Sequence, residues 1–306
     1  MEDDNGTYEY SKITQSGTIR LILLHPSDDL EAGLICSLID ARLQECDDDV
    51  VEHYIAISYV WGKAVENKSV LVDGKYLEIT ASLDQALRHV RDPSRILRIW
   101  ADGICINQGD VQDRNTQVAI MDSIYATARH TIIFLGPSYS EHELFLQKME
   151  ALSLSRESSD KQADSGSPQG MLEYPWFGRV WILQELALSP DPRVQIGRVR
   201  VRWNHFSKMI EGEAVTVQSL STRRKLFHEM CQIRGKLQGR MYMGAESEFK
   251  ITILDVLQAR RGLGVTDPKD MIYAHLGISE SQLKSHITID YSKSKAQVYE
   301  ETARYI

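Results

Sequence analysis

Short apolar runs of strand length alternate with amphipathic segments along the first part of the chain. The runs at residues 54–60, 96–106 and 131–135 are rich in β-branched and aromatic residues, which predicts buried strands. Between them, apolar positions recur at helical spacing and predict one helix that Ser82 caps and a second over residues 113–128. This alternation predicts an α/β fold, in which helices cover both faces of a mostly parallel sheet.

Other segments extend this pattern. Asp73-Gly74 lies between two apolar runs and predicts a β-hairpin, because this dipeptide suits a two-residue turn. Residues 175–188 begin with a proline and predict a single helix, and mostly helical patterns follow residue 200. We therefore expect three parts: a flexible acidic tail over residues 1–17, a core over 18–200, and a helical extension over 201–306 packed on the core.

The composition is that of a soluble globular protein. The 306 residues are 42% hydrophobic and 25% charged, which excludes a wholly disordered, collagen-like or coiled-coil chain. The early apolar run at residues 19–24 is too short to span a membrane, and Met1 is followed by acidic residues where a signal peptide needs basic ones. The four cysteines lack metal-ligand spacing, so we expect no metal site. These features predict a cytoplasmic protein without a membrane span.

The formal charge of −8 is unevenly distributed. Residues 1–185 hold 30 acidic and 16 basic side chains, whereas residues 186–306 hold 13 acidic and 19 basic ones. Such a difference favours electrostatic contact between the two regions. Arg198, Arg200 and Arg202 alternate along one predicted strand and could bind nucleic acid. Without interleaved aromatic residues, we instead expect them to face solvent or the acidic first region, and we expect no nucleic-acid partner.

Polar and aromatic residues gather where the predicted strands end. In parallel α/β sheets, ligands bind at the carboxyl ends of the strands. These ends lie here at residues 58–62, 102–108 and 136–140. None of them carries a glycine-rich dinucleotide motif or a Walker loop, so a conventional nucleotide site is not expected.

Three sequence blocks resemble the heterokaryon-incompatibility (HET) domain of fungal proteins. They are YIAISYVWG at residues 54–62, WADGICINQ at 100–108 and WFGRVWILQEL at 176–186. Between the blocks, the run from Asp113-Arg114 to Ala128 follows the same family pattern. The segments at residues 266–273 and 290–292 resemble stretches that commonly follow this core, so the resemblance covers residues 18–306.

The resemblance implies both a fold and a function. HET domains trigger cell death when genetically different hyphae fuse, and they are considered relatives of TIR domains. A TIR-like (flavodoxin-like) core with an added β-hairpin is therefore implied. So are programmed cell death in fungal innate immunity, a homo-oligomeric active form, and possible contact with other incompatibility proteins.

The resemblance also implies NAD hydrolysis. Residues 181–186 are similar to the TIR run Trp-Cys-x-x-Glu-Leu, whose glutamate cleaves NAD, and Ile182 replaces the cysteine. Glu185 is thus the expected catalytic carboxylate of an NAD glycohydrolase, with NAD as substrate and no bound cofactor. The surrounding binding residues are expected to be Ser58, Tyr59, Trp61, Gly62, Asp102, Arg114 and Trp181.

Physical reasoning from the residues leaves alternatives open. Trp181 and Glu185 share a helix face, where apolar rings would raise the pKa of the carboxyl and let it stabilise positive charge on a ribose. Glu185 could instead pair with Arg179 or Arg114 in a purely structural role, and Asp102 could simply cap its loop. The alternative function is a non-enzymatic TIR-like scaffold that triggers cell death through protein contacts.

Overall fold

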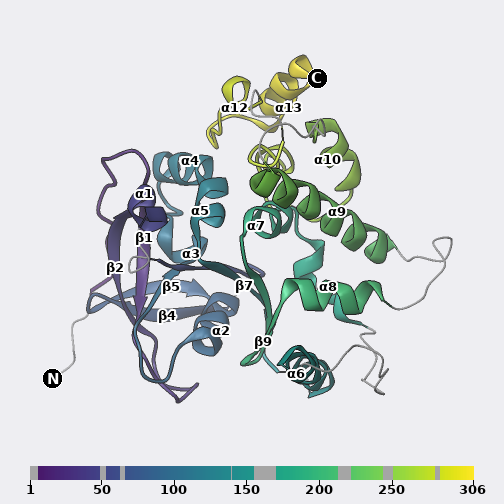
Figure 1. Cartoon of the computed structure of the whole chain (residues 1–306). Helices are drawn as coiled ribbons and strands as arrows, with labels where there is room; N and C mark the ends of the chain where they lie inside the picture. Colours follow the sequence, from purple (N-terminus) through teal and green to yellow (C-terminus); the bar gives the residue numbers. More distant parts are fainter. Residues whose placement is uncertain are drawn as a thin grey trace.

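A nine-stranded mixed sheet runs through the described part of the chain, in the order β5-β4-β2-β1-β6-β3-β7-β8-β9 (Figure 1). The computed structural model describes residues 6–48, 53–62, 66–138, 140–154, 170–212, 222–243, 251–279 and 283–306. The strands are β1 (Thr18–Leu24), β2 (Ile35–Arg42), β3 (Ile55–Ser58), β4 (Asn67–Val72), β5 (Lys75–Thr80), β6 (Leu97–Trp100), β7 (His130–Gly136), β8 (Pro192–Ile196) and β9 (Val199–Arg202).

Helices flank this sheet on both sides. In Figure 1, α4, α5, α7 and α9 lie above the sheet, and α2 and α6 lie below it. The α-helices are α1 (Leu43–Asp48), α2 (Ala81–Val90), α3 (Asp102–Cys105), α4 (Val111–Ala119), α5 (Met121–Thr127), α6 (Ser140–Leu154), α7 (Ile182–Leu188), α8 (Trp203–Glu211), α9 (Thr222–Met243), α10 (Ile253–Ala259), α11 (Asp270–Tyr273), α12 (Leu283–His286) and α13 (Lys295–Tyr305). Two short 3-10 helices are η1 (Met171–Glu173) and η2 (Pro175–Gly178).

The α/β class is confirmed, but the sheet is mixed rather than mostly parallel. Parallel pairings join β6, β3, β7 and β8 in its centre and also link β2 to β4. The pairings of β1 with β2 and β6, of β4 with β5, and of β8 with β9 are antiparallel. Tight turns explain two of these, because a two-residue hairpin can join only antiparallel strands. The predicted turn at Asp73-Gly74 has positive φ at both residues, +50° and +80°.

Four predicted elements differ in the structure. The single helix predicted over residues 113–128 is divided at Ile120 into α4 and α5. Helix α2 is capped by Thr80, which accepts a hydrogen bond from the Leu83 amide (3.3 Å), while the Ser82 hydroxyl donates to the Val60 carbonyl. The strand predicted over 96–106 ends at Trp100, and Asp102 begins the short helix α3 instead.

The helix predicted over residues 175–188 is interrupted. Helix η2 ends at Gly178, Arg179 is extended, and α7 starts at Ile182. The cause is a contact with a distant segment, because the Gly264 amide donates to the Gly178 carbonyl (3.0 Å) and Arg179 forms a β-bridge with Gly264. Tertiary pairing here overrides local helix propensity.

The N-terminal segment lies against the body wherever it is described. Thr7 forms a bridge with Tyr76, and the Tyr10 hydroxyl donates to the Ile104 carbonyl (2.9 Å). The Arg20 guanidinium donates to the Ser11 carbonyl (2.7 Å). Residues 6–17 of the expected flexible tail therefore have defined partners, whereas residues 1–5 lie outside the described residues.

One apolar cluster joins the expected core and the expected extension. It contains Ile133 of β7 and Leu186 of α7 together with Phe227 and Met230 of α9. The expected boundary at residue 200 lies inside β9. The division into core and extension stays a prediction, but its two parts share buried side chains.

Two of the three alternating arginines contact the first region. Arg198 donates to the Asp28 carbonyl (3.4 Å), and Arg200 donates to the Val90 carbonyl (3.2 Å). Arg202 lies 3.9 Å from Asp191. Within the described ranges, no helix is both long enough and apolar enough to cross a bilayer.

Candidate active site

A cleft of about 680 Å³ opens where β3 and β6 end. Residues 60–62 follow β3, and the stretch from Asp102 to Gln108 follows β6, so two strand ends supply one side. The interrupted helix supplies Pro175 and residues 178–181. Helices α4 and α5 supply Arg114, Val118 and Met121. The remaining wall comes from the C-terminal region, at Arg223, residues 264–267, Asp270 and Tyr291.

Behind the cleft lies a buried network centred on Ser58. The Ser58 hydroxyl donates to the Glu185 carboxylate, and its oxygen accepts a hydrogen bond from the Trp176 indole (2.7 Å). Ser58 and Glu185 are 1% and 2% exposed. Burial raises the pKa of Glu185 to about 7, although the positive charge of Arg179 and the Ser58 hydrogen bond oppose this rise. Glu185 therefore titrates near neutral pH.

Glu185 does not line the larger cleft. A second cavity of about 430 Å³ lies beside the cleft and is lined by Tyr59, Phe134 and Tyr174, among other residues. Val60 and Pro175 line both cavities and form the partition between them. Trp176 directly follows Pro175, and Ser58 lies two residues before Val60, so the backbone connects the Glu185 network to this partition.

Asp102 is the carboxylate that reaches the cleft itself. Its Oδ2 accepts a hydrogen bond from the Trp61 indole (2.7 Å), and the Tyr59 side chain also donates to it. Burial raises the pKa of Asp102, and the nearby Arg179 charge opposes the rise. Its Oδ1 is buried without a hydrogen-bond partner in the described part of the chain.

The positive charge of Arg179 acts on both carboxyls, although its guanidinium forms a hydrogen bond with neither of them. Its guanidinium donates to the Tyr59 carbonyl, while its charge lowers the pKa of Asp102 and Glu185. Arg260 donates to the Arg179 carbonyl (2.9 Å) and so fixes its backbone. The hydrogen-bond partner of Glu185 is thus the Ser58 hydroxyl.

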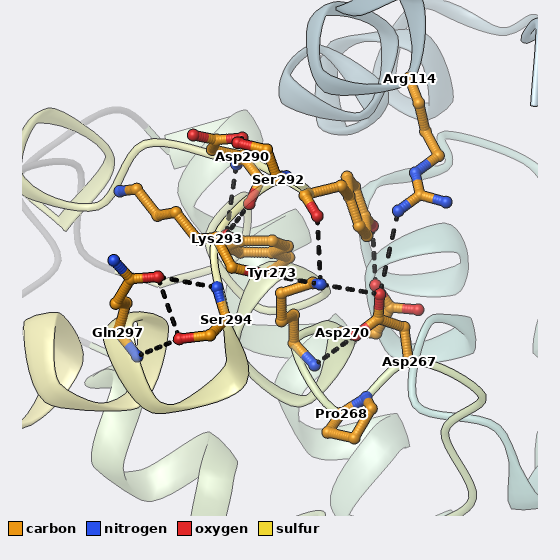
Figure 2. Close-up of polar contacts among 12 residues, drawn as sticks. Arg114, Asp267, Pro268, Asp270, Tyr273, Asp290, Ser292, Lys293, Ser294 and Gln297 are labelled. Carbon is orange, nitrogen blue, oxygen red and sulfur yellow. Dashed lines mark hydrogen bonds and ion pairs between the residues drawn. The ribbon is translucent and has the colours of Figure 1, made fainter. Parts of the chain in front are cut away.

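The C-terminal wall is a polar cluster centred on Tyr291. Figure 2 shows Arg114 extending toward Asp267, with Asp270 beside it. The Tyr291 hydroxyl donates to Asp270 (2.7 Å), and the Trp181 side chain donates to the same carboxyl. Burial raises the pKa of Asp270, and these two hydrogen bonds oppose the rise.

The predicted site residues separate into three groups. The larger cleft is lined by Trp61, Gly62, Asp102, Arg114 and Trp181. Tyr59 lines the smaller cavity. Ser58 and Glu185 form the buried pair, so Trp181 and Glu185 do not reach one cavity although they are one turn apart.

Sequence reasoning missed several residues of the cleft. They are Asp267, Asp270 and Tyr291 in the wall. Sequence reasoning proposes Arg179 as an alternative partner of Glu185, but its charge also acts on Asp102. The segments at residues 266–273 and 290–292 do stand out in the sequence, as stretches that follow the core in related proteins. Nothing in their local pattern indicates that they meet the strand ends.

Comparison with known proteins places this site in a family. Residues 54–185 match the family model "Heterokaryon incompatibility protein (HET)". The chain is also similar to "Heterokaryon incompatibility protein 6, OR allele" of Neurospora crassa, at 27% identity over 360 aligned positions. This alignment covers 94% of the chain but only 51% of the relative, so the chain spans about half the relative's length. No solved structure matches. Residues 54–185 therefore form a HET domain.

Proposed function

We propose that this chain is an effector of heterokaryon incompatibility that triggers regulated cell death by hydrolysing NAD, with Glu185 as the catalytic carboxylate. The observation that carries the proposal is the buried Glu185–Ser58 pair at the end of β3, beside a cleft of about 680 Å³. This volume lies within the range of small-molecule sites. A carboxyl with a pKa near 7 is typical of catalytic groups.

The strand order supports the TIR-like part of the proposal. Counted along residues 55–196 without the β4–β5 hairpin, the central strands β6-β3-β7-β8 have the order 2-1-3-4. Flavodoxin-like sheets share this order and bind ligands at the carboxyl ends of their strands. Ser58, at the end of β3, occupies such a position.

The proposed reaction consumes NAD and water and yields ADP-ribose, nicotinamide and a proton. The bond between nicotinamide and ribose breaks, and nicotinamide leaves with the bonding electron pair. The water oxygen then bonds to the ribose carbon. Ionised Glu185 would stabilise the positive charge that develops on the ribose, and it would accept a proton from the water.

Self-association of the chain would give NAD access to Glu185. Because Glu185 lines neither cavity, NAD could reach it only after the partition at Val60 and Pro175 moves. We propose that self-association moves the segment around Pro175 and so joins the two cavities. Activity should then rise more steeply than protein concentration.

Nicotinamide release from NAD tests this function. The purified chain is incubated with NAD over a wide range of protein concentrations, beside Glu185→Gln and an exposed control, Glu78→Gln. We expect release by the wild type and Glu78→Gln but not by Glu185→Gln. Equal release by all three chains would refute the catalytic assignment.

The burial of Glu185 also supports a second candidate function. Glu185 is enclosed and already hydrogen-bonded to Ser58, as a structural carboxyl would be. The chain would then act as a non-enzymatic scaffold that triggers cell death by contacting partners. In that case Glu185→Gln preserves toxicity in cells, whereas surface substitutions abolish it.

A further inference from the structure

Arg114 has unused hydrogen-bonding capacity in the cleft. Its guanidinium lies over the Tyr291 ring, 3.6 Å from the ring centroid. Its ion pair with Asp267 is long, at 3.8 Å, and its Nε has no hydrogen-bond partner among the described residues. An arginine carries five N–H donors in a planar fork that matches phosphate. The Arg114 guanidinium is therefore held in place, but within the described part of the chain not all of its N–H donors have a hydrogen-bond partner.

Tyr291 is held rigidly beneath this guanidinium. Its hydroxyl donates to Asp270 (2.7 Å), and its backbone amide donates to the Asn115 side chain (2.8 Å). The Tyr273 ring packs edge-on against it, at 5.4 Å between ring centroids. A fixed aromatic platform orients a stacked arginine, so less side-chain entropy is lost when a ligand binds.

The rest of the cleft offers aromatic surface. The indole N–H groups of Trp61 and Trp181 are taken by Asp102 and Asp270, which fixes two rings in the lining. A ligand that fits this lining would carry an anion for Arg114 and a planar ring for the indole surfaces.

We propose that Arg114, stacked on Tyr291, is the phosphate-binding subsite of a nucleoside diphosphate. A nucleotide combines the phosphate and the planar base that this lining can accept. The inference rests on the proposed function for the site's location, and it names the group that would hold the diphosphate of the substrate. Tyr291 and Asp270 are positioning residues, and they come from outside the matched HET region, residues 54–185.

Replacing Asp267 should change phosphate affinity in the direction opposite to replacing Arg114. It is the only carboxylate that the described structure pairs with Arg114, so it competes with an incoming phosphate. Neutralising Asp267 should strengthen phosphate binding, whereas neutralising Arg114 should weaken it. A purely structural ion pair would instead be damaged by either change.

Calorimetric titration of the full chain with ADP measures this binding. ADP lacks the nicotinamide–ribose bond, so the measurement does not depend on catalysis. We expect Arg114→Gln to weaken ADP binding by about tenfold to a hundredfold, because a charged hydrogen-bonding partner is lost. Asp267→Asn should tighten it several-fold, and Arg42→Gln, an exposed site outside both cavities, should leave it unchanged.

Adenosine serves as the uncharged reference ligand. We expect it to bind more weakly than ADP, with an affinity that Arg114→Gln does not alter. Equal ADP affinity in the wild type and Arg114→Gln, or no ADP binding at millimolar concentration, would overturn the subsite. If the expected ADP pattern appears without nicotinamide release, the subsite stands and the proposed hydrolysis fails. If NAD is hydrolysed but Arg114→Gln does not change ADP affinity, the proposed hydrolysis stands and the Arg114 subsite fails.

Discussion

At the scale of single residues, the site contains two buried carboxyls that share one cation. Burial raises the pKa of both Asp102 and Glu185, and Arg179 opposes the rise in each. Each carboxyl has a separate neutral donor, the Trp61 indole for Asp102 and the Ser58 hydroxyl for Glu185. Their positions differ as well, because Asp102 lines the larger cleft and Glu185 lines neither of the two cavities described above.

The pKa of Glu185 predicts how stability depends on pH. Folding raises this pKa from 4.5 to about 7, so the folded chain binds more protons than the unfolded chain between these values. The free energy of unfolding should therefore fall as pH rises from 4.5 to 7. Above pH 7 the cost of ionising Glu185 is complete, at about 3 kcal/mol.

Glu185→Gln isolates this effect, because its amide oxygen can still accept from Ser58 but does not ionise. We expect the variant to match the wild type near pH 4.5 and to be more stable at pH 8. Urea denaturation at several pH values measures the difference. Parallel pH curves for the two proteins would contradict a raised pKa at Glu185.

At the scale of elements, the C-terminal region is tied closely to α5 and α7. The Gly277 amide donates to the Gln184 side chain of α7 (3.2 Å). An added Cβ at Gly277 would lie 2.4 Å from the Asp122 Cβ of α5 and 2.6 Å from the Gln184 Oε1. Residue 277 must therefore be a glycine for these three segments to approach so closely.

Gly277→Ala should consequently destabilise the chain, by about 1–3 kcal/mol, since the added methyl group must push α5 or α7 away. Gly235→Ala on α9 is the matched control. No heavy atom lies within 4 Å of its added Cβ, so the higher helix propensity of alanine should stabilise the chain by about 1 kcal/mol. Urea midpoints of the two variants should shift in opposite directions. Destabilisation of similar size in both would contradict the close approach at Gly277.

At the scale of the whole molecule, the HET region and the C-terminal region share one apolar core. Ile133 and Leu186 pack in the same cluster as Phe227, Met230 and Val256. The cleft is likewise composite, because its wall at residues 264–267, Asp270 and Tyr291 lies beyond residue 185. Neither the core nor the cleft is complete within the matched region.

We therefore expect the chain to unfold in a single cooperative transition. Tryptophan fluorescence reports mainly on side chains up to Trp203, whereas circular dichroism also follows the later helices α9, α10 and α13. Urea curves from the two probes should coincide, as they do for two-state domains. Two separated transitions would show that the regions fold independently.

The sequence alone determined the features that depend on local pattern. The apolar runs located β3 and β7, and Asp73-Gly74 located the hairpin turn. The three sequence blocks likewise indicated the HET family, which the match over residues 54–185 confirms. Each of these signals lies within a few consecutive residues, where spacing, turn chemistry or motif can be read directly.

Tertiary structure decided the features that depend on distant partners. Gly264 interrupts the helix predicted over 175–188, Ser58 holds Glu185 in a buried hydrogen bond, and Tyr291 orients Arg114. Hydrophobic periodicity shows which face of an element is buried but not which distant residue it meets. The sequence therefore predicted the chemistry present at the strand ends, and only the folded chain decided which of those groups share a cleft.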